Sequence, residues 1–232
     1  KELLQAALGQ LYAFQWIPFR GLGVVTAGQI QRHLRSGRLD HQVPTLVLLS
    51  NHGLIVSCDS AEQARQVVGA VIQLCRKHLP VLKPVCLPQR NQLSIASARI
   101  RNSLGVQGSL MGVKPISGNR IRTPDGLSPQ REWFKGIITP EEMTYLAGGI
   151  VWIEQPESKV IQKAITRHQN KTGRTPMAFY VNQQGLVLAA DKKHISLYQE
   201  VFLFYLQIRG WAMRMNGLKP LPAKYLTPEG MI

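Results

Sequence analysis

The sequence has no long apolar stretch and few cysteines, and these absences exclude several classes of protein. Its 232 residues never reach the roughly 18 uninterrupted apolar positions that a membrane span needs, since even the apolar run over 201–206 is soon followed by Gln207 and Arg209. The opening KELLQAALGQLYAF has neither the long apolar core nor the small-residue cleavage site of a secretory signal. We therefore expect a soluble, cytoplasmic protein without a membrane partner, whose sequence reads as the interior of a longer chain.

Cysteine is too rare and too irregularly spaced to build a framework. Cys58, Cys75 and Cys86 are odd in number and include no Cys-x-x-Cys pair. Disulfide scaffolds and zinc knuckles both need a more regular spacing. Neither is expected here.

Acidic residues are also few, and the chain is strongly basic. Lysine and arginine total 28 against 13 acidic residues, a formal net charge of +15. Such an excess is typical of proteins that bind nucleic acid or anionic membranes. The basic residues are scattered without a run of five or six, and no nucleic-acid-binding signature accompanies them. A nucleic-acid partner is therefore not expected, whereas an anionic small substrate and a merely solvated basic surface fit the charge equally well.

The best-defined local pattern surrounds His52. VPTLVLLSNHGLIVSCD predicts two apolar strands over 45–49 and 54–57, joined by the polar turn Ser50-Asn51-His52-Gly53. A short amphipathic helix is predicted before them over 24–36, and a helix capped near Ser60 is predicted after them, to His78. The pattern indicates an α/β protein with His52 at the mouth of a sheet.

The middle of the chain has a different composition. Residues 89–131 are rich in glycine and proline among scattered arginines, with little periodicity, which favours a connector containing one short helix near 95–104. Regular structure resumes in FKGIITPEEMTYL, where Thr139 can cap a helix with Pro140 at its first position and Glu142 three residues after the cap. We expect three parts: 1–88, the connector 89–131, and a second unit over 132–232.

The second unit repeats the first. At an offset of 132 positions, LVLLSNHGLIVSCDSAEQARQVV from Leu46 aligns with AFYVNQQGLVLAADKKHISLYQE from Ala178, and both predict strand, polar turn, strand, acidic cap and helix. Identities are few, so two unrelated units of the same ordinary kind remain an alternative. His52 aligns with Gln184, and an amide is a poor substitute for imidazole at a zinc-type site. We therefore expect the second unit to be structural.

Four segments of the sequence can be compared with a known family. They are LVLLSNHGLIVSCDSAEQA, the upstream YAFQWIPFRGLGVVTAGQIQRHL, and the later FKGIITPEEMTYLAGGIVWIEQ and TPMAFYVNQQGLVLAADKKH. Together they resemble the class II aldolase/adducin family in its long form. The resemblance implies a layered α/β/α domain with a largely antiparallel central sheet, partial in this chain, followed by a smaller, degenerate α/β repeat. It also implies a homo-oligomer, because members of the family often form tetramers with active sites at subunit contacts.

The resemblance also implies a metal site that this sequence contains only in part. Family members with aldolase activity hold a divalent metal, usually zinc, with three histidines and often a glutamate, and His52 matches the last of these histidines. The other two form His-x-His about sixty residues earlier, which would fall before Lys1, and no His-x-His occurs in the sequence. The chain thus resembles a fragment, or a divergent member without the N-terminal half of the catalytic domain, and is expected to be inactive alone. Asn51 and Gly53 are expected to shape the turn, with Gly53 allowing a close approach of the strand.

Three functions follow from these patterns. The first is a divalent-metal-dependent sugar-phosphate aldolase, a carbon–carbon lyase in its complete form, with His52 as metal ligand and no assigned acid or base. The second is a non-catalytic, adducin-like binding or scaffolding module, which the missing ligands and the basic charge favour. The third is nucleic-acid binding through the arginines of the connector. The remaining histidines are expected to be solvated or capping residues. They are His33, His41, His78, His168 and His194.

Overall fold

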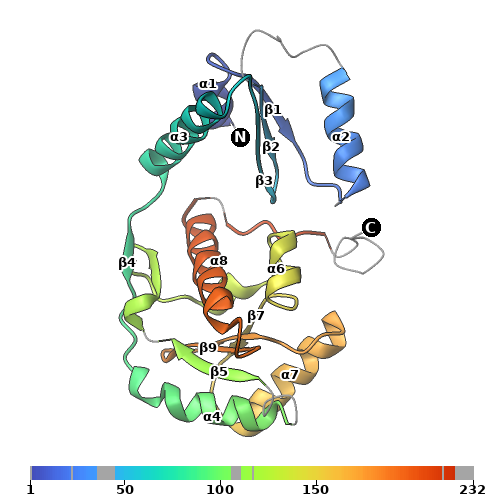
Figure 1. Cartoon of the computed structure of the whole chain (residues 1–232). Helices are drawn as coiled ribbons and strands as arrows, with labels where there is room; N and C mark the ends of the chain where they lie inside the picture. The colour runs from blue at the N-terminus through green and yellow to red at the C-terminus, as the bar shows by residue number, and fades with distance from the viewer. Residues whose placement is uncertain are drawn as a thin grey trace. The chain divides into compact units, whose positions relative to one another are not determined.

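Helices and open sheets alternate along the chain in the computed structural model, which describes residues 2–21, 23–35, 45–105, 111–116, 118–215 and 217–222 (Figure 1). The predicted mixed α/β class is confirmed. The chain divides into two units: one contains the residues up to Leu79 together with Pro222, and the other runs from Pro80 to Leu221. No helix in the described part of the chain is long and apolar enough to cross a membrane.

The first unit is built on a three-stranded sheet in the order β1-β2-β3. Strands β1 and β2 run parallel, and β2 and β3 run antiparallel through the turn that contains His52. The elements are α1 (Glu2–Leu8), β1 (Ala13–Ile17), α2 (Val24–Arg35), β2 (Thr45–Leu49), β3 (Gly53–Ser57) and α3 (Ala61–His78). The helix and the strand pair predicted over 24–57 are thus confirmed.

One face of this sheet carries the core of the first unit. Because successive strand residues point to opposite faces, Phe14 and Leu46 lie on the same side, where they pack with Val67 and Val71 of α3. The spacing of four puts both valines on one side of the helix. Helix α3 begins as predicted, because the Ser60 side chain accepts a hydrogen bond from the backbone N–H of Gln63 at 3.1 Å.

The second unit contains a four-stranded sheet in the order β5-β9-β8-β7 and a small ribbon of β4 and β6. Strands β7 and β8 run parallel, and the pairs β8 with β9 and β9 with β5 run antiparallel. Its strands are β4 (Leu82–Pro84), β5 (Gly112–Ile116), β6 (Arg122–Pro124), β7 (Ile150–Ile153), β8 (Ala178–Val181) and β9 (Gly185–Ala190). Its helices are α4 (Leu93–Ser103), α6 (Pro140–Tyr145), α7 (Ser158–Thr172) and α8 (Ile195–Met215), with short 3-10 turns η1 (Arg90–Gln92), η2 (Gly118–Arg120) and η3 (Arg131–Phe134).

Helices cover both faces of this larger sheet (Figure 1). On one face, Ile100 of α4 and Ile161 of α7 pack with Phe179 and Val187. On the other face, the long helix α8 contributes Phe202 to a core with Tyr180. Strands β8 and β9 are buried on both faces. These two strands therefore form the centre of the sheet's core.

Residues 89–131, which the sequence suggested as a connector, are part of the second unit. The predicted short helix is present as α4, and β5 pairs along its length with β9. The expected boundary at residue 88 therefore falls inside a folded unit, and the second unit is larger than its predicted span of 132–232. The glycines and prolines obscured the pattern because β5 contains Pro115, which is tolerated at a sheet edge.

Both units contain the same succession of elements, as the aligned segments suggested. In the first it is β1, α2, β2, β3 and α3, and in the second β7, α7, β8, β9 and α8. In each, the strands before and after the first helix pair in parallel, and the next strand returns antiparallel. The second unit adds α4 and β5 beyond β9. Among the described residues, no strand pairs with the corresponding edge of β3.

Candidate functional site

His52 lies in a tight turn between β2 and β3. Asn51 adopts a left-handed backbone with φ of 59°, which asparagine tolerates better than most residues. The backbone N–H of His52 donates to the carbonyl of Leu49 at 3.2 Å, and that of Ser50 donates to Ile17 of the neighbouring strand at 2.9 Å. Asn51 therefore shapes the turn as predicted. The close approach expected at Gly53 is not present, because no described atom lies within 4 Å of the place a Cβ would occupy there.

The imidazole of His52 is exposed at the end of the sheet. The crevice beside it, between β1, β2 and helix α2, has Phe19 and Gln29 in its walls and a volume of about 10 Å³. That is the room of about one water molecule. A substrate or metal would therefore meet His52 from its open side rather than in this crevice.

The described residues do not complete a metal centre around His52. Within residues 45–105 and the other described ranges, no three histidine, cysteine, aspartate or glutamate side chains lie close enough together to hold an ion. Catalytic zinc normally takes three protein ligands. His52 by itself does not meet that requirement, so the zinc site implied by the family resemblance stays a prediction.

The second unit repeats the turn in detail. Gln183 has φ of 58°, the N–H of Gln184 donates to Val181 at 3.0 Å, and the N–H of Asn182 donates to Ile153 at 2.9 Å. The left-handed residue and both hydrogen bonds have counterparts 132 residues earlier, at Asn51, His52 and Ser50. The alignment of the two segments therefore extends to backbone geometry.

The two turns differ in what covers them. The turn of the second unit is closed, because Gln89 donates from its backbone to the carbonyl of Gln183 at 3.1 Å and from its side chain to that of Gln183 at 3.2 Å. A Cβ on Gly185 would stand 3.0 Å from the carbonyl oxygen of Ile116, and Gln184 is 2% exposed. The structure thus places an exposed imidazole on one turn and a buried amide on the other.

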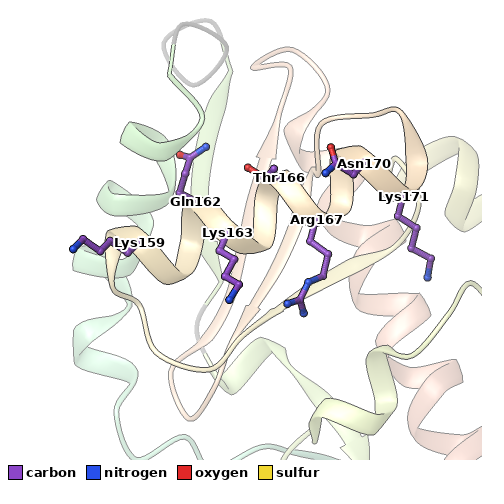
Figure 2. A pocket seen from close by; sticks show the side chains of 7 residues that line it. All are labelled: Lys159, Gln162, Lys163, Thr166, Arg167, Asn170 and Lys171. Atoms are coloured by element: carbon purple, nitrogen blue, oxygen red, sulfur yellow. The ribbon is translucent and has the colours of Figure 1, made fainter.

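A second polar surface runs along the solvent side of α7. Figure 2 shows its side chains projecting from one helix, along an open hollow. They are Lys159, Gln162, Lys163, Thr166, Arg167, Asn170 and Lys171. All are exposed, and the four basic ones recur at every fourth position. We call this set the α7 basic face. The sequence interpretation missed it because it searched for consecutive basic residues, whereas a search at helical spacing would have found it.

The other described histidines lie on helices or beside a helix end. His78 ends α3, and His194 lies 3.9 Å from Asp191 just before α8. His168, predicted to be solvated or capping, is half-buried in α7, and its Nε2 bonds to the carbonyl of Ala147 at 2.7 Å. His41 lies outside the described residues. His33 of α2 bonds through Nδ1 to the carbonyl of Gln29 at 2.9 Å.

His168 should make the second unit sensitive to acid. Burial lowers the pKa of this imidazole below its ordinary value, in spite of the bond to Ala147, and Lys171 lowers it further. The folded state then binds fewer protons than the unfolded state, so stability falls as pH drops through the unfolded pKa of about 6.5. We expect His168→Gln, whose amide can still donate to Ala147, to lose less stability than the wild type between pH 7.5 and 5. His194→Gln should behave as the wild type does in urea unfolding at both pH values.

No family model matches the chain, and no curated protein or solved structure matches it. The likeness to the class II aldolase/adducin family therefore rests on the segments quoted from the sequence.

Proposed function

We propose that this chain is a class II aldolase-like protein whose first unit contributes His52 to a divalent-metal site. The observation that supports the proposal most is the contrast between the two turns. Both have the same backbone, but the second is covered and carries Gln184, whereas the first is open and carries an imidazole. A catalytic copy of the turn must be open to substrate and must carry a metal-binding side chain, as the first turn does. Under the proposal, the closed turn of the second unit has only a structural role.

The fold is consistent with this assignment at the level of layers. The second unit has helices on both faces of a sheet in which two of the three strand pairings are antiparallel. Under the proposal, this is the degenerate repeat and the first unit is part of a layered catalytic domain. The edge of β3 is where such a domain would continue.

His52 supplies one nitrogen ligand and the turn fixes its position. In the complete site, a metal such as zinc would supply a Lewis acid that stabilises the negative charge of an enediolate during cleavage of a sugar phosphate. The remaining ligands would come from outside the described residues, including another subunit of a homo-oligomer. Exposure of His52 leaves its imidazole accessible to them.

Zinc titration of the purified chain in its native oligomeric state tests the proposal. We expect calorimetry to give zinc binding that is about tenfold or more weaker in His52→Ala, because a ligand is removed. His194→Ala is the matched control, since it removes an exposed imidazole elsewhere, and should bind zinc as the wild type does. Equal affinity in the wild type and His52→Ala, or no zinc uptake by the wild type, would contradict the proposal.

A non-catalytic, adducin-like binding module is the second candidate, and the α7 basic face favours it. A binding surface needs exposed charge, and these residues are exposed. Zinc uptake separates the two functions. Uptake by the wild type that is lost in His52→Ala supports the metal site of a lyase, and no uptake by the wild type supports the module.

A further inference from the structure

Four basic side chains are spaced regularly along α7. Lys159, Lys163, Arg167 and Lys171 follow one another at intervals of four residues, which places them on one side of the helix (Figure 2). At 1.5 Å per residue, the twelve-residue span from first to last extends about 18 Å along the helix axis. Because each step of four residues exceeds one turn by about 40°, the four cations wind over about 120° of the helix surface on its solvent side.

This row costs the helix stability. Three successive pairs at i and i+4 carry like charge, each unfavourable by about 0.2–0.5 kcal/mol. Lys159 also lies in the first turn, where a positive charge opposes the helix dipole, and no acidic residue occupies that turn. Across the described ranges, none of the four cations forms an ion pair. Burial of Ile161 and Ile165 on the opposite side offsets the cost.

The chemistry of the face narrows the class of partner. It carries no aromatic or large apolar side chain, so it has neither the buried anchors of a protein–protein hot spot nor the apolar face that inserts into a membrane. Its remaining side chains, Gln162, Thr166 and Asn170, are hydrogen-bonding groups. A polar, positively charged surface of this kind is typical of nucleic-acid interfaces.

We propose that α7 binds the phosphate backbone of double-stranded nucleic acid without reading its sequence. With both strands counted, a duplex carries one negative charge per about 1.7 Å of its axis, so an 18 Å stretch of helix lies within reach of several phosphates. Single strands are usually held by stacking of bases on aromatic side chains, which this face lacks. The proposal concerns a site other than His52 and does not depend on the lyase assignment. It reverses the sequence-based expectation of no nucleic-acid partner, because α7 gathers basic residues that are dispersed in the sequence.

Fluorescence anisotropy with a labelled DNA duplex of about 20 base pairs tests the proposal between about 50 and 200 mM salt. Four phosphate contacts predict that the logarithm of the binding constant falls with the logarithm of salt concentration with a slope of about −3.6. Replacing Lys163 and Arg167 together with glutamine should bring the slope to about −1.8 and weaken binding about 60-fold at 0.1 M salt.

The control removes the same charge elsewhere. Lys192 and Lys193 are exposed residues that lie outside α7, before α8. The double change Lys192→Gln and Lys193→Gln lowers the net charge by two as well, but should weaken duplex binding less than about threefold. If the two double variants lose equal affinity, binding reflects overall charge and the proposal is wrong.

Charge reversal separates binding from folding. Lys163→Glu converts two repulsive pairs, with Lys159 and Arg167, into attractive ones, so the helix should become slightly more stable. Duplex binding should nevertheless fall more than tenfold. Loss of both stability and binding would contradict the assignment.

Two further probes distinguish other polyanions. A single strand of equal length should bind less tightly than the duplex, and phosphatidylserine-rich vesicles should not be retained in preference to it. A change at Lys163 and Arg167 that weakens binding to vesicles or single strands but leaves the duplex unaffected would overturn the proposal.

Discussion

Replacing Arg209 with methionine should lower the free energy of unfolding of the second unit by about 3–5 kcal/mol. Arg209 and Glu142 are both fully buried, and the guanidinium meets the carboxylate through two bonds, Nε to Oε1 at 2.8 Å and Nη2 to Oε2 at 2.6 Å. Two backbone carbonyls accept further bonds, that of Trp133 from Nη1 and that of Gly136 from Nη2. Methionine keeps much of the packing but leaves the carboxylate of Glu142 buried without its cation.

An exposed ion pair provides the control for this experiment. Arg120 and Glu200 lie 3.2 Å apart with both side chains more than half exposed, so Arg120→Met should cost less than about 1 kcal/mol. Urea unfolding followed by tryptophan fluorescence suits both variants, because Trp133 is buried in the second unit and becomes exposed when that unit unfolds. Losses of the same size in the two variants would show that burial does not govern the strength of the Arg209 pair.

The double variant isolates the charge. Replacing Glu142 with leucine in the Arg209→Met background removes the stranded carboxylate, and should recover a large part of the lost stability. Recovery would assign the cost to an unpaired buried charge. No recovery would assign it to the bonds that Arg209 makes to Trp133 and Gly136, together with the bond that Glu142 accepts from the N–H of Ile138 at 2.8 Å.

The Glu142 region shows where sequence-based prediction stops. Thr139 as a cap, Pro140 in the first turn and Glu142 three residues later are a local pattern, and the N–H of Glu142 does donate to Thr139 Oγ1 at 3.3 Å. The sequence therefore predicted α6. It did not show that Glu142 is a buried ion-pair partner, because Arg209 lies 67 residues away and no local spacing connects them.

The same difference between local patterns and long-range contacts explains why the sequence suggested a connector over residues 89–131. Strand β5 is short, contains Pro115 and finds its hydrogen-bonding partner in β9, more than 70 residues later. Nothing within residues 89–131 indicates that pairing. The strand pair on either side of His52, by contrast, is joined by a turn of three residues, so local alternation and turn chemistry were sufficient to predict it.

The candidate sites divide in the same way. The His52 turn and its likeness to the turn at Gln184 were visible in the aligned segments. That one turn is open and the other closed depends on Gln89 and Ile116, which are brought there by packing. The α7 basic face lay within reach of the sequence, since a period of four in a predicted helix is sufficient to find it.

Gly210 should tolerate no side chain, although it lies inside a helix where alanine is ordinarily the better residue. A glycine-to-alanine change in a helix interior gains about 1 kcal/mol from propensity. At Gly210 of α8, however, a Cβ would stand 2.6 Å from Cδ of Pro124 and 2.9 Å from the ring of Trp133. Both are rigid groups, and overpacking of this kind costs about 3 kcal/mol. We expect Gly210→Ala to destabilise the second unit by about 2 kcal/mol net.

Gly69 of α3 is the matched control, at which alanine should raise the free energy of unfolding rather than lower it. It is half-buried, but no described atom lies within 4 Å of the place its Cβ would occupy, so Gly69→Ala should stabilise the first unit by about 1 kcal/mol. Hydrogen exchange of backbone amides measures each unit separately, which matters because two units need not unfold together. If both alanines stabilise, the contact of α8 with Pro124 and Trp133 is looser than its distances indicate. If both destabilise, Gly69 is held by a constraint other than space, because its helix offers a Cβ nothing to displace.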